Sequence, residues 1–378
     1  MRTYNLFNLL LACLVLMSCS TSDEGTGVGE GPTNPGTDAD YVLLLTSGTT
    51  LKSQLLNAGA ELVTVNPADS DFKNTGIPDL TYREGLEMSF YQRTGVCGGE
   101  ILKYDFINDT ATELALFEDL GDCGLTAYAI AHTETRVYVA YGLEVDAKDT
   151  KYFVRVVDLD STDENFVDVP LDKKPLDLVF TNNRLFVLAL DEAVTDENAL
   201  FVMDAATNTM IIEMNLGFDA QRLIKNSDGN LVISYDELHT LLNSQTLSIQ
   251  YVNYQEGKEP RFVSSRSNNF DNEGRLYYEM SPGENSSYPK VPGIYDFAND
   301  IVILYAYENF LTEAQRTIEY EIETTTMVDF DTKNGYMLIG YKKVGLDKGG
   351  LLRVKTGSEP AVIDNLDVDG IPYAIIVK

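Results

Sequence analysis

Histidine is scarce in this sequence: the 378 residues include only His132 and His239. With so few imidazoles we expect neither a histidine-based catalytic triad nor a histidine-rich metal site. We interpret His132, beside an expected hairpin turn, and His239, within an expected strand, as packed or surface side chains. Among 59 acidic residues, carboxylate pairs arise by chance, so no pair identifies a glycoside hydrolase. The sequence therefore predicts no catalytic residue, no metal site and no cofactor.

Basic residues are also few: 28 Lys and Arg stand against 59 Asp and Glu, which gives a formal charge of -31. A body with this charge repels nucleic acid and anionic membrane surfaces. Hydrophobic residues make up 44% of the chain, which argues against disorder. We therefore expect a folded acidic protein with no nucleic-acid partner, built as one large all-β unit or as two domains.

The apolar run at residues 6–17 is too short to span a bilayer. It follows the positive charge of Arg2 and ends in the sequence Leu-Met-Ser-Cys, which has the form of a bacterial lipobox. We therefore predict a lipoprotein signal peptide at residues 1–18 and lipidation of Cys19. The alternative is an ordinary signal peptide in which the cysteine is incidental.

Residues 19–40 contain Gly, Pro, Ser, Thr and acidic residues, with no large apolar side chain before Tyr41. Such a composition is typical of a flexible tether, and about twenty residues of it have a root-mean-square reach of about 25 Å. We expect this acidic tether to hold the folded body, residues 41–378, away from a membrane.

Cysteine is rare as well, with four residues in the chain. Cys13 lies in the expected signal peptide and Cys19 carries the expected lipid, which leaves Cys97 and Cys123. An even pair in an exported protein favours a disulfide. Closing a loop of about 26 residues would stabilise the fold by about 3 to 4 kcal/mol in the chain-entropy picture. The alternative is two unpaired thiols.

One motif, a tight polar turn followed by an alternating apolar strand, recurs along the chain at spacings of about 45 to 60 residues. Its copies are TETRVYVAYG (133–142), TNNRLFVLAL (181–190), SDGNLVISYD (227–236), NEGRLYYEMS (272–281) and KNGYMLIGYK (333–342). Three further strands surround each copy, and four strands per unit are typical of a propeller blade. A β-sandwich or an α/β fold fits less well, since only residues 52–58 and 309–317 have a helical pattern.

The blades can be counted from this repeat. Residues 41–48 match the second strand of a blade and residues 60–67 the third, while residues 371–378 match a first strand. The last strand would complete the first blade and close the ring, so that no open edge remains. We predict an all-β, seven-bladed propeller, whose six uninterrupted units begin near Ile77, Gly124, Leu176, Ala220, Arg261 and Glu323.

In a propeller, the loops between strands two and three and the connections from strand four to the next blade lie on one face, which we call the mouth face. Recruited function usually resides in such loops. Cys97 and Cys123 both fall there, which favours their pairing. A basic, tyrosine-rich mouth would suit an anionic, aromatic or sugar-like ligand, although lysines collect in loops anyway. The ligand-binding candidates are Arg93, Lys173, Lys174, Arg222, Arg261, Tyr128 and Tyr373.

Tryptophan is absent. Quinone-dependent propeller dehydrogenases use Trp-bearing blade motifs and a Trp floor under the cofactor, so we do not expect that class. Many sugar-binding clefts also use Trp, although the 22 tyrosines could take its place.

With its lipobox, its acidic residues Asp23 and Glu24 and its seven irregular blades, the chain resembles the Bacteroidota surface lipoproteins with YVTN-like or quinoprotein-like propellers. The resemblance implies an outer-membrane lipoprotein, exposed at the cell surface, that touches the membrane only through its lipid. It also implies non-catalytic capture of a ferric chelate, another anionic small molecule or a glycan, beside a TonB-dependent receptor. The alternatives are a protein-interaction scaffold of the cell envelope and a polysaccharide-processing enzyme.

Overall fold

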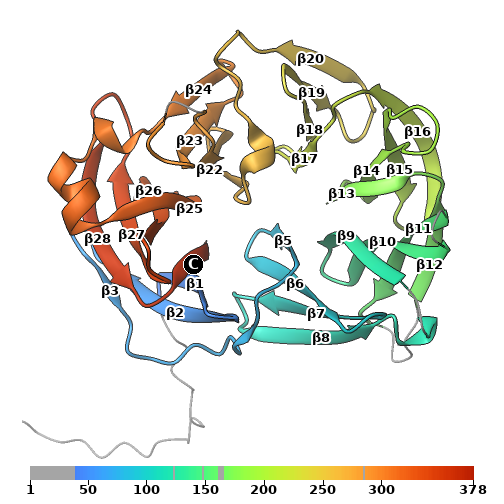
Figure 1. Ribbon diagram of the computed structural model, residues 1–378, viewed down its shortest axis with the longest axis horizontal. Coiled ribbons are helices and arrows are strands. Elements are labelled where there is room, and N and C mark those ends of the chain that lie inside the picture. The colour runs from blue at the N-terminus through green and yellow to red at the C-terminus, as the bar shows by residue number, and fades with distance from the viewer. Residues whose placement is uncertain (1–38, 122–123, 147–148, 161–165, 284–285) are drawn as a thin grey trace, which may run out of the picture. The chain divides into compact units, whose positions relative to one another are not determined.

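The computed structural model describes residues 39–121, 124–146, 149–160, 166–283 and 286–378. Residues 39–378 form one compact unit, in which seven antiparallel sheets surround a central axis (Figure 1). The predicted all-β, seven-bladed propeller is therefore confirmed. None of the helices in the described ranges has the length and apolar character needed to cross a membrane.

We number the blades in chain order and give each blade's strands from the axis outward. Blade 1 contains β29 (Ile371–Val377), β1 (Tyr41–Ser47), β2 (Thr50–Ala58) and β3 (Val63–Val65), and β4 (Thr75–Gly76) also pairs with β2. Blade 2 contains β5 (Leu80–Glu84), β6 (Glu87–Thr94), β7 (Gly98–Asp105) and β8 (Thr110–Leu116). Blade 3 contains β9 (Gly124–His132), β10 (Arg136–Asp146), β11 (Asp149–Asp158) and β12 (Phe166–Leu171).

The remaining blades follow the same order. Blade 4 contains β13 (Lys174–Thr181), β14 (Arg184–Leu190), β15 (Asn198–Asp204) and β16 (Thr209–Gly217). Blade 5 contains β17 (Arg222–Lys225), β18 (Leu231–Ser234), β19 (Leu238–Leu242) and β20 (Ile249–Asn253). Blade 6 contains β21 (Asn269–Phe270), β22 (Arg275–Met280), β23 (Val291–Asp296) and β24 (Ile301–Leu304). Blade 7 contains β25 (Ile322–Asp331), β26 (Tyr336–Lys343), β27 (Gly349–Lys355) and β28 (Ala361–Val368).

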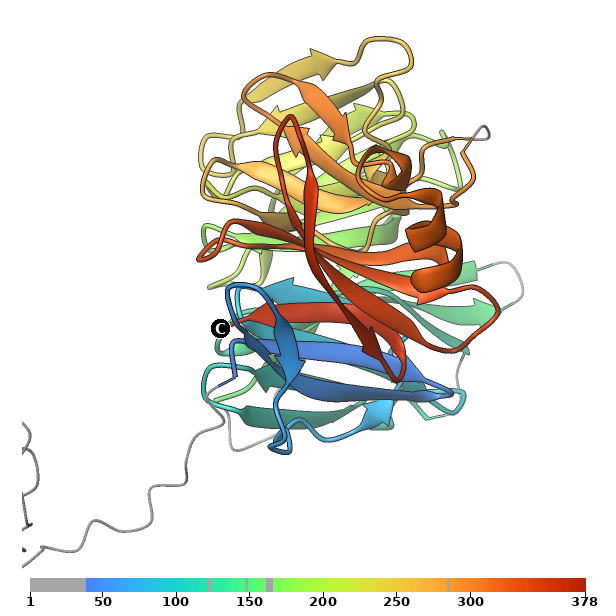
Figure 2. The same ribbon diagram turned by 90° about the vertical axis from the view of Figure 1, so that its left-hand side faces the viewer.

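The C-terminal strand closes the ring, as predicted. Strand β29 pairs antiparallel with β1, from Tyr41 opposite Val377 to Thr46 opposite Ile371. In Figure 2 the red C-terminal strand lies beside the blue first strand. Ile375 and Ile376 are buried in two different core clusters. The last strand therefore supplies the inner edge of blade 1 and part of its core.

The outer half of blade 1 differs from our prediction. We expected residues 52–58 to be loop or helix and residues 60–67 to be the third strand. The third strand is β2, which follows β1 through a two-residue turn with Gly48 at φ 59°, and the fourth is β3. The prediction failed because β2 does not alternate: Lys52, Ser53 and Gln54 are successive half-buried polar residues.

Blade 6 has the shortest inner strand. It begins at Asn269, eight residues after the start that we expected near Arg261. Arg261 has a left-handed backbone with φ 52° and precedes a short 3-10 helix, η2 (Phe262–Ser264), so the chain turns here before it enters the sheet. The helical pattern at residues 309–317 corresponds to two short helical turns, η3 (Tyr307–Asn309) and η4 (Gln315–Glu319). A fourth short helical segment, η1 (Glu118–Leu120), precedes blade 3.

Aspartates at the ends of third strands shape the hairpins to the fourth strands. The Oδ1 atoms of Asp105, Asp204 and Asp296 each accept hydrogen bonds from backbone N–H groups two and three residues later, at 2.7 to 3.2 Å. Asn208 and Asp300, later in two of these turns, have positive φ of 54° and 52°. Side-chain turns of this kind favour Asp and Asn. Some of the many acidic residues therefore serve to form hairpin turns.

Four inner strands have a β-bulge at a similar level. The register skips one residue in β9, β13 and β29 and two residues in β25. A bulge redirects the side chains around it and is frequent beside functional sites. The extra residues at this level are Tyr128, Leu176, Thr326 and Tyr373, and β25 also skips Glu323 near its start. Two of the four are thus tyrosines that were ligand-binding candidates.

Candidate functional site

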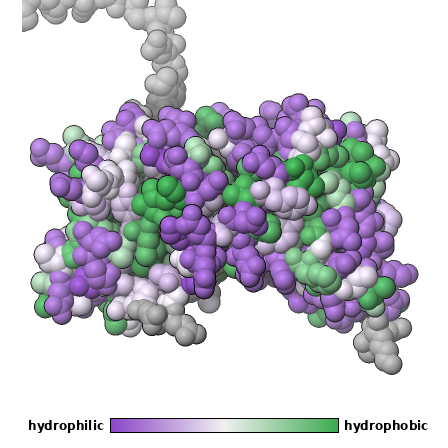
Figure 3. Space-filling model, turned by 90° about the horizontal axis from the view of Figure 1, so that it is seen from above, coloured by the Kyte–Doolittle hydropathy of each residue, from purple (hydrophilic) through white to green (hydrophobic). Residues whose placement is uncertain are grey.

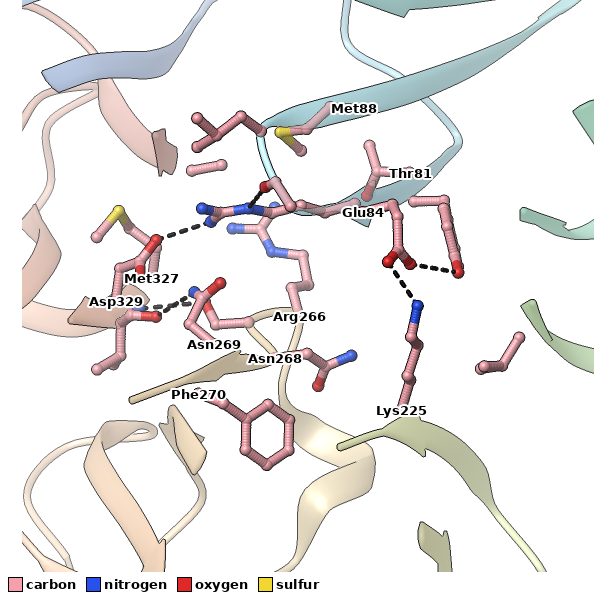
Figure 4. Close-up of a pocket in the computed structure, with 18 of the residues that line it drawn as sticks. Thr81, Glu84, Met88, Lys225, Arg266, Asn268, Asn269, Phe270, Met327 and Asp329 are labelled. Atoms are coloured by element: carbon pink, nitrogen blue, oxygen red, sulfur yellow. Dashed lines mark hydrogen bonds and ion pairs between the residues drawn. The ribbon is translucent and has the colours of Figure 1, made fainter. Parts of the chain in front are cut away.

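All seven inner strands line a central cavity of about 890 Å³ (Figure 4). This volume is in the range of small-molecule binding sites. Inner strands run in the same direction in every blade, so their first residues lie toward the mouth face and their last residues toward the opposite face. The two ends of the cavity therefore carry different sets of side chains.

An ion pair crosses the cavity at the end opposite the mouth face. Glu84 ends β5 in blade 2 and Lys225 ends β17 in blade 5, on the other side of the ring (Figure 1). The Lys225 ammonium donates to Glu84 Oε1 over 2.5 Å, and the Tyr82 hydroxyl donates to the other oxygen over 3.3 Å. The pair is visible in Figure 4. It forms a polar bar across this end of the channel.

Arg83 forms further polar contacts at the end of the cavity opposite the mouth face. Its guanidinium donates to Asp329 in blade 7 over 2.7 Å and to the Ile375 carbonyl in blade 1 over 3.0 Å. Burial raises the pKa of Asp329, while Arg83 acts in the opposite direction. Arg83 and Lys225 are thus both matched by carboxylates of the protein, and this end of the cavity has no excess positive charge among these four groups. We call Arg83, Glu84, Lys225 and Asp329 the ion-paired floor.

Arg266 enters the cavity from the loop before β21, as Figure 4 shows. Its guanidinium lies 4.4 Å from the ring centroid of Tyr373 and donates to the Thr326 carbonyl over 2.9 Å. Both partners are the bulged residues of their strands. Arg266 is exposed, and no carboxylate of the described residues forms an ion pair with it. Its charge therefore contrasts with those of the ion-paired floor.

The loop that carries Arg266 is fixed by Glu279, a residue of β22 that is only 1% exposed. The Glu279 carboxylate accepts hydrogen bonds from the backbone N–H groups of Arg266 and Ser267 over 3.0 and 3.1 Å. It also accepts from the hydroxyls of Ser265 and Ser267, the latter over 2.7 Å. A buried carboxylate with several donors holds a loop in one conformation, so the Arg266 backbone is positioned in advance.

Two further cations lie close to Arg266. Arg222, the first residue of β17, donates to the carbonyls of Phe262 (3.1 Å) and Ser265. Burial lowers the pKa of Lys290; Glu279 opposes this, while the charges of Arg266 and Arg222 lower it further. Lys290 thus interacts electrostatically with both arginines, while the carboxylates of Asp177 and Glu279 act on Arg222 with opposite charge. We call Arg222, Arg266 and Lys290 the cationic corner.

The structure brings together part of the predicted site. Tyr128, Arg222 and Tyr373 all line the cavity. Lys174 is near it, 5.6 Å from the ring centroid of Tyr128, but its ammonium pairs with Glu192 over 2.6 Å. That ion pair raises the pKa of Lys174. Lys174 is therefore a neutralised neighbour of the site.

Three candidates do not line the cavity. Arg93, near the end of β6, is exposed and donates to the carbonyls of Gly95 and Val96 in the loop that follows. Lys173 pairs with Glu213, and Arg261 donates to the Ser281 carbonyl over 3.3 Å. Local loop and blade contacts, which the sequence pattern did not indicate, hold these side chains.

The predicted cysteine chemistry falls largely outside the described residues. Cys19 lies in residues 1–38 and Cys123 in the gap at residues 122–123. Cys97 is described and lies in the loop between β6 and β7, on the mouth face as expected. Lipidation of Cys19 and the Cys97–Cys123 disulfide therefore stay predictions.

Sequence reasoning missed Arg266 and all four residues of the ion-paired floor. Arg266 was not recognised as a candidate because we expected the first strand of blade 6 to start near Arg261, whereas it starts at Asn269. Its position just before a first strand, which matches that of Lys173 in blade 4, is a signal that could have revealed it.

His132 has neighbours that we did not expect. Its Nδ1 lies 2.7 Å from Ser89 Oγ, and its Nε2 lies 3.6 Å from Glu87. These are the residue types of a hydrolase triad, an arrangement that the sequence did not lead us to expect. Both Ser89 and His132 are 0% exposed, and burial, aided by Lys103 and Lys225, lowers the pKa of His132 to about 3. The trio is closed to substrate and its base is weak, which fits a packing role.

No group of three His, Cys, Asp or Glu residues in the described ranges has an arrangement that could hold a metal ion.

No family model and no curated protein matches the chain. Among solved structures it is similar to the β-propeller domain of the trilobed protease from Pyrococcus furiosus, with 11% identity, a TM-score of 0.41 and coverage of 86% of this chain and 83% of that one. It is also similar to Porphyromonas gingivalis dipeptidyl peptidase 4 (12%, 0.47, 86% and 51%) and to a protein of unknown function from Bacteroides caccae (10%, 0.41, 77% and 98%). The chain thus spans about half of the dipeptidyl peptidase. These distant likenesses are of fold alone and carry no argument about function.

Proposed function

We propose that this protein is a non-catalytic, lipid-anchored protein of the cell surface that captures a small anionic ligand in its central cavity. The observation that supports capture most directly is the exposed guanidinium of Arg266, stacked on Tyr373 in a cavity lined by all seven blades. In a chain of charge -31 a cationic corner is a strong local contrast. Local potentials of this kind concentrate and orient ligands of opposite charge.

The ring supplies a rigid frame for such a ligand. The inner strands are bonded within their blades, and Glu279 fixes the Arg266 loop. A site that is already ordered loses little conformational entropy on binding. The Glu84–Lys225 bar crosses one end of the cavity, so the ligand enters from the mouth face.

Anchoring and location rest on the sequence. The lipobox at Cys19 and the acidic tether would hold the propeller at the outer membrane, where captured ligand could pass to a TonB-dependent receptor. Ferric chelates and other anionic small molecules fit the cationic corner better than neutral glycans, because its guanidinium favours oxyanions.

A protein-interaction scaffold is the second candidate, and the outer strands favour it. Tyr251 on β20 is 66% exposed and Ile301 on β24 is 51% exposed. Figure 3 views the ring from the side on which Figure 1 places these strands, and it shows hydrophobic patches among hydrophilic surface. Apolar side chains along a strand edge suit pairing with another protein.

Thermal unfolding of the full-length chain in detergent tests the capture proposal. The panel contains ferric citrate, citrate, pyrophosphate, an oligogalacturonate and a neutral glucan. A ligand at one hundred times its dissociation constant stabilises a protein by about 2.7 kcal/mol, which raises the midpoint by several degrees. A shift with any of the four anions supports capture of an anionic ligand. A shift with the neutral glucan alone, or no shift across the panel, contradicts it, and no shift at all favours the scaffold.

A further inference from the structure

We propose that the cationic corner is an oxyanion subsite, which binds a carboxylate or phosphate group of the captured ligand. This inference rests on the proposed capture function and specifies which part of the cavity holds the charged group. The subsite consists of Arg266 as the direct ligand contact, with Arg222 and Lys290 contributing positive potential.

The Arg266 guanidinium retains hydrogen-bond donors that a ligand can use. A guanidinium has five N–H donors. One nitrogen of Arg266 donates to the Thr326 carbonyl, and one face of the group lies against Tyr373. The interactions of its side chain with the described residues leave donors for an incoming group. The planar fork of a guanidinium matches two oxygens of a carboxylate or phosphate.

The two ends of the cavity differ in whether their cations are paired with carboxylates. Arg83 and Lys225 in the ion-paired floor are matched by Asp329 and Glu84 at 2.7 and 2.5 Å. An anion that bound there would compete with carboxylates already in place. Arg266 has no such carboxylate among the described residues, so an anion reaches it without breaking an ion pair.

Glu279 is not the ion-pair partner of the Arg266 guanidinium. Its carboxylate accepts from the Arg266 backbone N–H, from Ser265 and from Ser267. Those hydrogen bonds fix the loop and direct the carboxylate to its backbone. Glu279 therefore positions Arg266 and lowers the local repulsion among the three cations, while the guanidinium itself extends to the cavity.

Lys290 responds to the charges around the subsite: burial lowers its pKa, and Glu279 acts in the opposite direction. The like charges of Arg266 and Arg222 contribute to its lowered pKa. A bound oxyanion would offset that repulsion, because an opposite charge nearby favours the protonated amine. Binding should therefore raise the pKa of Lys290 and cause proton uptake at alkaline pH.

Isothermal titration calorimetry of the full-length chain at low ionic strength is the test, with pyrophosphate and citrate as separate probes. The test variant is Arg266→Gln, and the matched control is Arg93→Gln, which removes the same charge from a loop outside the cavity. We expect Arg266→Gln to weaken binding of at least one probe tenfold or more, and Arg93→Gln to leave it unchanged. Preference for pyrophosphate or for citrate would identify phosphate or carboxylate as the natural group.

A chemical measurement on the unaltered protein covers the case in which Arg266→Gln does not fold. Phenylglyoxal modifies accessible arginines, and the modified positions can be read by peptide mass spectrometry. The bound probe should protect Arg266 and leave Arg93 reactive. Equal reactivity of Arg266 with and without saturating probe would overturn the proposal.

The outcomes separate this inference from the capture function. Equal affinity in the parent and in Arg266→Gln, or equal losses in both variants, overturns the subsite. If the anions bind equally well to the parent and to Arg266→Gln, the subsite is wrong and capture of an anionic ligand still holds. If only the neutral glucan shifts the unfolding midpoint, both the subsite and anion capture are wrong. If nothing in the panel binds, both proposals fail.

Discussion

Glu84 and Lys225 lie 141 residues apart in the chain, yet their side chains meet at 2.5 Å across the axis of the ring. Their blades, 2 and 5, are separated by two intervening blades on the shorter path around the ring. This contact crosses the channel at the end opposite the mouth face, and Arg222 and Arg266 also line the cavity. The proposed direction of ligand entry depends on it.

The Glu84–Lys225 bar should restrict access more than it stabilises the fold. Both side chains are partly exposed, at 39% and 30%, so solvent screens the pair. We expect a double-mutant cycle of Glu84→Gln and Lys225→Met to give a coupling energy of at most about 1 kcal/mol. Urea denaturation of the four proteins measures it. A coupling of several kcal/mol would mean that the bar is a main structural tie of the ring.

A buried ion pair in blade 7 should behave differently. Arg353 is 0% exposed and donates two hydrogen bonds to Asp364, at 2.8 and 2.9 Å. Replacing Asp364 by Asn leaves that guanidinium buried without its counter-charge, and we expect a loss of about 3 to 5 kcal/mol of unfolding free energy. The control is Glu113→Gln, which disrupts an exposed pair with Lys73 and should cost less than about 1 kcal/mol. Similar losses in both variants would contradict this view of blade 7.

Ring closure by β29 predicts a large effect of one C-terminal side chain. Ile376 is 0% exposed in the core of blade 1. We expect Ile376→Ala to cost about 2 to 5 kcal/mol, and deletion of residues 371–378 to abolish cooperative unfolding. Val194→Ala, at an 82% exposed position, is the matched control and should leave the midpoint unchanged. A truncated protein that melts like the parent would refute closure by the last strand.

The two buried histidines predict a loss of stability in mild acid. Burial lowers the pKa of His132 to about 3 and that of His239 to about 4 in the folded protein, against about 6.5 in the unfolded chain. Below pH 6.5 the unfolded state takes up protons that the folded state does not. Stability therefore falls as pH falls from about 6.5 toward the folded values, by about 2 kcal/mol per histidine at pH 5.

Urea denaturation between pH 7 and 5 checks this dependence. The double variant His132→Gln and His239→Gln should be less stable at pH 7 but should show a flatter pH profile than the parent. An unchanged slope in the double variant would assign the acid sensitivity to carboxylates.

The sequence predicted the blades well where local chemistry defines them. Turns with Gly or Asn before alternating strands, and aspartates such as Asp105 at the ends of strands, recur in several blades because those hairpins need them. It predicted β2 poorly, because Lys52 to Gln54 do not alternate, and it misplaced β21, which has only two residues.

The site was less predictable than the fold. Tyr128, Arg222 and Tyr373 were found because they lie near the starts of inner strands. Whether a cation is neutralised depends on its partner in another blade or loop, such as Glu213 for Lys173 or Asp329 for Arg83. Those partners lie 40 and 246 residues away, and no local pattern indicates them.

The most direct test of the central claim is a crystal structure of the protein grown with a saturating concentration of the tightest-binding panel anion. The account predicts density for the anion inside the central cavity, with its oxygens within hydrogen-bonding distance of the Arg266 guanidinium. Density only at surface loops such as that of Arg93, or an empty cavity with Arg266 unchanged, would contradict it.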